Sequence, residues 1–365
     1  MKQSAHTYDI KINSAPNVQN IHRLICASLF ILAFAAESAH GRAGVPQGVF
    51  SITVGGKEPQ EEVLANPNVD GVTLRYDWAS LEPIEGVFDF SYLDTNVASV
   101  AAAGKKVLLR ISTQTGKPKW VTTAVKNAGG LFFRFVSDGT NVSIPVFWDP
   151  TFLRKKTAMI AALGNHFGNN PAVAIVAASF ANATSEDWNV PHTPDLVQQW
   201  LNLGYTSEKL IGAGQTILDA TMMAFPNQYV TLAIGGNGSG SGSLDPTSDY
   251  VARAVVEDIR SVWPNRLITQ KNDLSTFIPD YPGEDTLYSM ITDFAPNVAG
   301  QMLYQCINDP TYKVNNGIPI DPALALALSI INGVAYNEKY IEIYQVDVVN
   351  SSKVIAVAHE ALTAP

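Results

Sequence analysis

Short apolar runs recur along the chain, and each is rich in the β-branched and aromatic residues that favour strands. Turn residues or longer periodic segments separate one run from the next. Eight runs qualify as predicted strands, and they cover residues 49–55, 71–77, 106–112, 172–179, 229–235, 266–272, 300–306 and 340–346.

Between the predicted strands lie segments with helical periodicity. They cover 91–104, 151–168, 193–226, 248–263 and 322–335, and the third is expected to break into two helices near Gly204. Strands that alternate with helices indicate βαβ units and a parallel sheet. Eight such units predict a (β/α)8 TIM barrel, which also fits the length of the chain. The alternative is an open doubly wound sheet, but VGGKEP (54–59) lacks the glycine fingerprint of its phosphate turn.

Two insertions interrupt the regular spacing. The segment LFFRFVSDGTNVSIPVFWD (131–149) predicts a hairpin after the third strand, with Asp138 and Gly139 at its turn. The segment GGNGSGSGSLDP (235–246) follows the fifth strand and predicts a mobile loop. Both are expected on the face where the βα loops of a barrel build active sites.

The N-terminal part of the chain has a different pattern. Arg23 precedes LICASLFILAFAA (24–36), an apolar run of 13 residues that ends in small residues. This order is typical of a secretory signal, and the run is short for a transmembrane helix. We expect residues 1–39 to form a signal peptide and 40–365 a single barrel domain, in a secreted or periplasmic protein that leaves the membrane after cleavage. An uncleaved anchor is the alternative.

Composition and charge exclude several function classes. The net charge is −9 and the chain has no basic tract, which argues against a nucleic-acid partner. The six histidines show no HxH or HExxH spacing, so no histidine-built metal site is expected and no cofactor is implied. There is no G-x-S-x-G elbow of a serine hydrolase. Outside the predicted signal peptide the only cysteine is Cys306, which we interpret as a buried small hydrophobe.

Polar and aromatic residues gather at the carboxyl ends of the predicted strands, where barrels carry their function. Amides and carboxylates bond sugar hydroxyls, and aromatic rings stack on the apolar face of a sugar. The mixture therefore indicates a carbohydrate substrate. The candidate substrate-binding residues are Arg75, Asp77, Trp78, Arg110, Trp120, Asn182, Asp187, His192, Asn272, Gln301 and Tyr344.

Glycoside cleavage needs two carboxyl groups that flank the scissile bond. Glu186 and Asp187 follow the fourth strand, and Glu342 stands between two isoleucines in the eighth. A carboxylate in such an apolar strand is costly unless it is paired or used. We expect Glu186 to be the general acid/base, with Asp187 as its substitute, and Glu342 to be the second carboxylate. A separation of about 5–5.5 Å would predict retention and about 6.5–9.5 Å inversion.

Each assignment has a structural alternative. Arg75, expected with Tyr344 to orient Glu342, can instead bridge layers at the barrel floor. Glu186 and Asp187 can cap a short helix or face solvent. Glu342 can orient a ligand instead of taking part in catalysis, whereas a solvated face is hard to reconcile with its flanking isoleucines.

Three segments carry the motifs of a known family. They are WASLEPIEGVFDFSYLD (78–94), KKVLLRISTQTGKPKWV (105–121) and FWDPTFLRKKTAMIAALGNHFGNNPAVAIV (147–176). They resemble three consecutive segments of retaining β-galactosidases and related (β/α)8 glycoside hydrolases. The first resembles the segment after the second strand, the second resembles the third strand with its P-x-W loop, and the third resembles the next helix. The resemblance covers residues 71–176 well and implies a glycosidase barrel.

The chain departs from that clan at its catalytic positions. The clan places Asn-Glu at the end of the fourth strand, where this chain has Ser-Phe-Ala-Asn (179–182), and a nucleophilic glutamate at the end of the seventh, where it has Gln301 and Gln305. An amide cannot attack an anomeric carbon. The eighth strand, with Glu342, resembles that of a divergent secreted branch of these barrels.

The sequence thus predicts a secreted glycoside hydrolase-like protein that cleaves an oligo- or polysaccharide with two carboxylates. The alternatives are a carbohydrate-binding protein on a catalytically degenerate glycosidase barrel, which the departures favour, and a purely structural barrel.

Overall fold

A computed structural model describes residues 44–137, 139–179, 190, 193–234, 249–277, 286–308, 315 and 317–364. The predicted signal peptide and the predicted loop at 235–246 lie outside these residues. From Gly44 onward the chain forms one compact unit.

Eight parallel strands close into a barrel. They are β1 (Gly48–Ile52), β2 (Gly71–Asp77), β3 (Lys106–Ser112), β6 (Val173–Ala177), β7 (Tyr229–Ile234), β8 (Leu267–Leu274), β9 (Val298–Met302) and β10 (Tyr340–Tyr344). The order around the barrel is β1-β10-β9-β8-β7-β6-β3-β2, and β1 closes the ring because it pairs with both β10 and β2. Each strand overlaps one predicted strand, so the predicted (β/α)8 barrel is confirmed.

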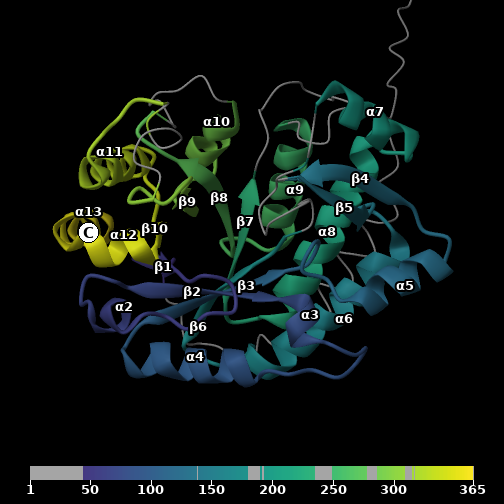
Figure 1. The fold of residues 1–365 in the computed structure, drawn as a ribbon, viewed down its shortest axis with the longest axis horizontal. Helices are drawn as coiled ribbons and strands as arrows, with labels where there is room; N and C mark the ends of the chain where they lie inside the picture. Colours follow the sequence, from purple (N-terminus) through teal and green to yellow (C-terminus); the bar gives the residue numbers. More distant parts are fainter. Residues whose placement is uncertain are drawn as a thin grey trace, which may run out of the picture. The chain divides into compact units, whose positions relative to one another are not determined.

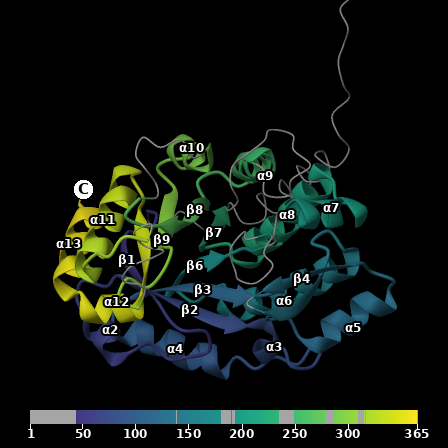
Figure 2. The same ribbon diagram turned by 45° about the horizontal axis from the view of Figure 1, so that its top comes forward.

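Helices lie outside the strands in both ribbon views (Figure 1, Figure 2). They are α2 (Glu61–Ala65), α3 (Trp78–Leu81), α4 (Ser91–Ala102), α5 (Lys119–Asn127), α6 (Pro150–Phe167), α7 (Pro194–Asn202), α8 (Ser207–Ala224), α9 (Asp249–Val262), α10 (Thr286–Asp293), α11 (Pro322–Ala335), α12 (Gln345–Asn350) and α13 (Ser352–Thr363). None of these helices, within the residues that the structure describes, has the length and apolarity needed to span a membrane.

Local sequence signals set where the helices begin and end. Asp149 caps α6 by accepting a hydrogen bond from the backbone N–H of Phe152 at 2.8 Å, and Pro150 occupies the first turn. Asp321 caps α11 in the same way. The predicted break near Gly204 lies between α7 and α8, where Gly204 adopts a φ of 81°.

A β-hairpin is inserted between α5 and α6, in the crossover from β3 to β6. Its strands β4 (Phe132–Ser137) and β5 (Thr140–Pro145) pair antiparallel, and Gly139 in the turn has a φ of 74°. The hairpin packs on α7, because the ring of Phe133 stacks on that of Trp200 with 3.8 Å between centroids.

The apolar core has two layers, because strand residues point alternately into the barrel and out toward the helices. The outer layer fills the space between strands and helices and includes Trp78, Leu93 and Ile341. A smaller inner cluster fills part of the barrel interior with the residues Phe50, Leu108, Ile175, Tyr229, Ile268, Ala299 and Tyr340.

Candidate active site in the barrel

Glu342 lies at the centre of the barrel and has no exposed surface. Its carboxylate accepts hydrogen bonds from Thr73 Oγ1 and Arg110 Nη2, each at 2.5 Å. Thr73 belongs to β2 and Arg110 to β3, and neither strand neighbours β10 in the sheet. These bonds therefore cross the interior. The carboxylate that is costly in an apolar strand is paired with a buried arginine, which is the condition for keeping a charge inside a protein.

Arg110 joins Glu342 to the seventh barrel strand. Only 3% of Arg110 is exposed, and its Nη1 donates to Gln301 Oε1 at 2.7 Å. Gln301 thus accepts through its oxygen, which fixes the orientation of its amide. The sequence predicts that Arg75 orients Glu342 and that Arg110 binds substrate; the structure gives Arg110 the orienting role.

Gln270 of β8 completes the support of Glu342. Its Nε2 donates to Glu342 Oε2 at 2.5 Å and to Asn272 Oδ1 at 2.7 Å. Its Oε1 accepts from Tyr340 Oη at 2.7 Å and from Thr231 Oγ1 at 3.0 Å. Burial, reinforced by the charge of Glu342, raises the pKa of Tyr340, so its phenol stays a neutral donor.

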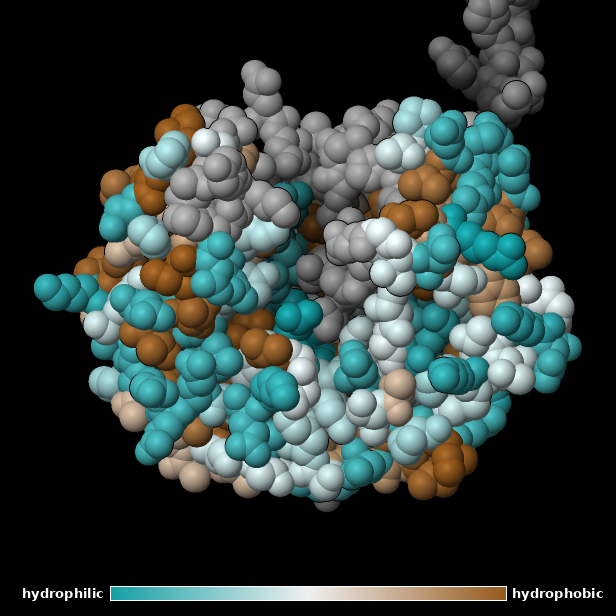
Figure 3. Space-filling view, viewed as in Figure 1, coloured by the Kyte–Doolittle hydropathy of each residue, from teal (hydrophilic) through white to brown (hydrophobic). Residues whose placement is uncertain are grey.

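Four predicted residues lie at or near the carboxyl ends of their strands. Arg75 and Asp77 end β2, Asn272 lies in β8 and Tyr344 ends β10. Asp77 is exposed and the other three are half-buried, so all four present surface at this end of the barrel. In the view of Figure 1, the surface has a hollow near the centre of the molecule, and hydrophilic residues form part of the hollow's wall (Figure 3).

The two tryptophans predicted to bind substrate both pack against the apolar core. Trp78 has no exposed surface, and Trp120 is half-buried against the same apolar cluster. Both bind Glu82: Trp78 Nε1 donates to its Oε2 at 2.7 Å, and Trp120 Nε1 donates to its backbone carbonyl at 3.0 Å. A fully buried ring cannot stack on a sugar, so the role predicted for Trp78 is corrected to packing.

The same glutamate explains the motif WASLEPIEG. Glu82 Oε1 also accepts from the backbone N–H of Gly86 at 2.8 Å, and Gly86 has a φ of 78°. Glu82 therefore holds the turn at 83–86 against α3 and α5. The motif that carries the family resemblance is a structural tie between elements.

Four predicted residues lie outside the described part of the chain: Asn182, Glu186, Asp187 and His192. The separation of Glu186 and Glu342, and with it the choice between retention and inversion, stays a prediction.

Sequence reasoning missed Thr73 and Tyr340 as partners in the Glu342 network. The alternation of side chains between the two faces of β2 and β10 could have indicated these partners, because residues two apart in a strand point to the same face. It also underrated Asp347, which is 1% exposed and accepts from the backbone N–H groups of Cys306 and Ile307, each at 2.8 Å. Asp347 thereby holds the segment after β9. Burial raises the pKa of Asp347, and these two bonds oppose the shift.

No group of three or more histidine, cysteine, aspartate or glutamate side chains among the described residues could hold a metal ion. The chemistry available in the described part of the barrel is that of a buried carboxylate, its arginine and surrounding amides.

Comparison with known proteins shows which family part of the chain resembles. Residues 60–210 match the model of glycoside hydrolase family 42, whose description is beta-galactosidase. The catalytic domain of beta-amylase from Paenibacillus polymyxa is similar in structure, with a TM-score of 0.54 and 11% identity over 88% of this chain and 100% of that one.

Two beta-galactosidases are similar to the same degree. The enzyme from the psychrophilic Marinomonas ef1 gives a TM-score of 0.54 at 11% identity over 81% of this chain, and the one from Bacillus circulans sp. alkalophilus gives 0.53 at 11% over 83%. This chain spans 54% and 50% of their respective lengths. The structures share the barrel fold, and the family match falls on the segments that carry the sequence motifs. The chain therefore has the (β/α)8 barrel fold of these glycosidases, and its residues 60–210 are similar to glycoside hydrolase family 42.

Proposed function

We propose that the protein is a secreted glycoside hydrolase that cleaves O-glycosidic bonds of an oligo- or polysaccharide at the carboxyl end of its barrel. The observation that supports this most is the ion pair of Glu342 and Arg110, bound to amides from two further strands, in a chain of this clan. β-Galactosides are the first substrates to test, since the matching family model and two similar structures carry that name.

In the proposed mechanism Glu342 is the second carboxylate and Glu186 the general acid/base. Arg110, Thr73 and Gln270 donate to the Glu342 carboxylate and fix its position in the barrel. An ionised carboxylate beside the sugar stabilises positive charge as the glycosidic bond breaks. Export depends on residues 1–39, which N-terminal sequencing of the exported protein tests.

The experiment is a panel of aryl glycosides and oligosaccharides, led by an aryl β-galactoside. Glu342→Gln keeps the size of the side chain and removes its charge, so the function predicts a loss of roughly 10²–10⁴-fold in kcat/KM. Circular dichroism verifies that the variant is folded. Glu360→Gln, a change of an exposed residue on α13, is the matched control and leaves turnover unchanged. Full activity of a folded Glu342→Gln variant rejects the role of Glu342.

A specific observation supports a second function, that of a carbohydrate-binding protein. Glu342 has no exposed surface and its oxygens already accept three side-chain donors, while Gln301 stands in the strand where the clan carries its nucleophile. This function predicts saturable sugar binding by calorimetry without turnover of any substrate in the panel. Turnover by the unsubstituted protein that is lost in the Glu186→Gln variant would support the glycoside hydrolase over the binding protein.

A further inference from the structure

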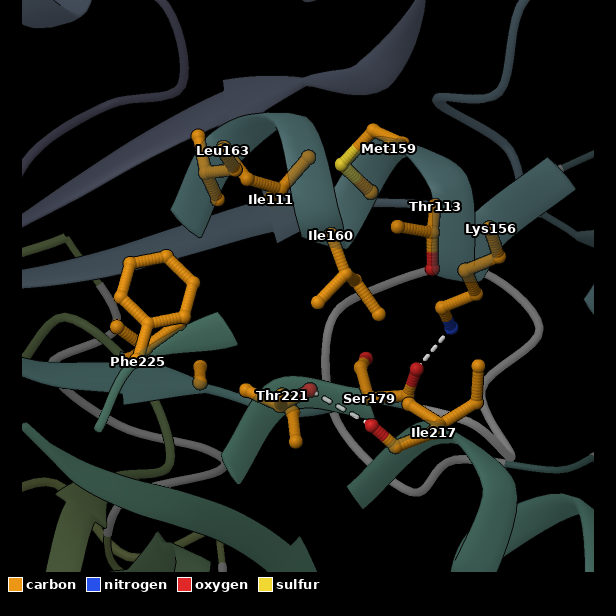
Figure 4. A pocket seen from close by; sticks show the side chains of 13 residues that line it. Ile111, Thr113, Lys156, Met159, Ile160, Leu163, Ser179, Ile217, Thr221 and Phe225 are labelled. Carbon is orange, nitrogen blue, oxygen red and sulfur yellow. Dashed lines mark hydrogen bonds between the residues drawn. The ribbon is translucent and has the colours of Figure 1, made fainter. Parts of the chain in front are cut away.

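A small cavity lies between the helices α6 and α8 and the carboxyl ends of β3 and β6 (Figure 4). Its volume of about 20 Å³ accommodates one particle the size of a water molecule. Most of its wall is apolar, formed by residues such as Ile160, Leu163 and Ile217. It is separate from the Glu342 network, because none of the residues of that network lines it.

A buried lysine is the main polar group of this cavity. Lys156 occupies a position on α6 that faces the core, between Phe152 and Ile160, and only 2% of it is exposed. Its Nζ donates to the backbone carbonyl of Ser179, and the described residues offer no bond to the other N–H groups of the ammonium. Figure 4 shows Nζ directed toward the space between Thr113 and Ser179.

No charged group among the described residues of the cavity wall compensates Lys156. Apart from Lys156, the residues that line the cavity from β3, β6, α6 and α8 include no Asp, Glu, His, Lys or Arg. Burial in these surroundings lowers the pKa of Lys156 to about 7. A buried ammonium for which the described residues offer no counter-charge is unfavourable, so both the neutral amine and the ammonium are populated near neutral pH.

Thr113 supplies a second polar group to the cavity. It follows β3, is 3% exposed, and its Oγ1 has no hydrogen-bond partner among the residues that the structure describes. A buried hydroxyl in this condition is costly, and a ligand that accepts its hydrogen bond recovers the cost. The cavity therefore offers donors and a positive charge in a space of one small particle with apolar walls.

We propose that this cavity is a binding site for a small monovalent anion of the size of chloride. The anion accepts from Lys156 Nζ and Thr113 Oγ1 and binds together with one proton, because the amine must become an ammonium to pair with it. The folded protein thus takes up H⁺ and the anion as a neutral pair. Affinity for the anion rises as the pH falls through the pKa of Lys156. Since Lys156 also binds the backbone of Ser179, the site lies directly beside the end of β6.

Thermal unfolding of the full chain in sodium chloride and in sodium gluconate of equal ionic strength tests the site. Gluconate is too large for the cavity. At pH 6 chloride should raise the midpoint by about 2 °C or more, saturably, and sodium bromide should act in the same way. At pH 9 the difference should shrink. Equal midpoints in chloride and gluconate at pH 6 overturn the proposal.

Variants assign the effect to this cavity. Lys156→Met removes the cation and should abolish the difference between the salts. Lys155→Met is the matched control, because that neighbouring side chain forms an exposed ion pair with Glu85 and should keep the chloride effect. Thr113→Val should weaken chloride binding about fivefold through the loss of one hydrogen bond. If Lys156→Met does not fold, bromide soaked into crystals of the unsubstituted protein decides: a bromide peak beside Nζ supports the site, and its absence overturns it.

Discussion

Two buried glutamates near the same strand differ in their hydrogen-bond partners. Glu342 in β10 accepts three hydrogen bonds from side chains, one of them from an arginine. Glu338, four residues earlier, is 3% exposed, and neither of its oxygens has a hydrogen-bond partner among the described residues. It fits against Gly300 and Gly333, where a Cβ would lie 2.1 and 2.5 Å from its Oε2. Burial, and then the charge of Asp273, raise the pKa of Glu338 well above its usual range.

The raised pKa of Glu338 makes stability depend on pH. The unfolded chain releases this proton near pH ~4.3, while the folded chain keeps it, so stability falls as the pH rises above that value. The slope is at most about 1.4 kcal/mol per pH unit. Glu338→Gln removes this pH dependence, because glutamine does not titrate. The variant should therefore gain stability relative to the unsubstituted protein as the pH rises from about 5 to about 8.

Urea unfolding across this pH range measures the difference. Glu360→Gln, at an exposed position, should follow the unsubstituted protein at every pH. Parallel pH curves for Glu338→Gln and the unsubstituted protein would show that Glu338 is ionised in the fold.

Between elements, close helix packing depends on single glycines. Gly164 in α6 faces the end of α8, and a Cβ on Gly164 would lie 2.4 Å from the backbone carbonyl oxygen of Ala224. A backbone atom cannot move aside as a flexible side chain can. Gly212 in α8 is different, because a Cβ added there would have nothing within 4 Å.

The same substitution at these two glycines should have opposite effects. Gly212→Ala should stabilise the protein by roughly 0.5–1 kcal/mol, because alanine favours the helix without a clash. Gly164→Ala should destabilise it by roughly 1–3 kcal/mol, because α6 and α8 must separate. Free energies of unfolding in urea measure both. Stabilisation by Gly164→Ala would contradict the close contact between the helices.

At the scale of the whole molecule, closure of the barrel joins the two ends of the described chain. β1 pairs with β10, and α13 packs on β1 and on α11. Ile355 on α13 is fully buried, whereas Val357 on the same helix is 67% exposed. The C-terminal helix thus covers the seam where the barrel closes.

Ile355→Ala should destabilise the barrel by roughly 2–5 kcal/mol, because it leaves a cavity at this seam. Val357→Ala should change stability by less than about 0.5 kcal/mol. All six tryptophans precede residue 264, so their fluorescence reports on unfolding far from α13 in the sequence. If the barrel unfolds as one unit, the fluorescence and circular dichroism transitions of Ile355→Ala shift together. Separate transitions would show that α13 detaches alone.

The sequence by itself determined the order and type of the elements, because periodicity is a local property. The strands β2 and β3 and the helix α11 begin and end where the pattern predicts. The seventh predicted strand, 300–306, is shifted toward the C-terminus relative to β9, which covers Val298–Met302. The strand ends earlier than predicted because Leu303 N bonds to Leu274 O outside the regular ladder.

Only the tertiary structure decided which side chains meet. Arg110 and Glu342 are 232 residues apart, and barrel closure together with strand register brings them into contact. Sequence position provides no reason to prefer Arg110 over Arg75 as the partner. Sequence position also does not distinguish Trp78, which is buried in the core, from a tryptophan that is exposed and able to bind a sugar. Glu342 was recognisable in the sequence as a carboxylate that needs a partner, because the cost of burying a charge is local, but its partners come from strands that only the closed barrel places opposite it.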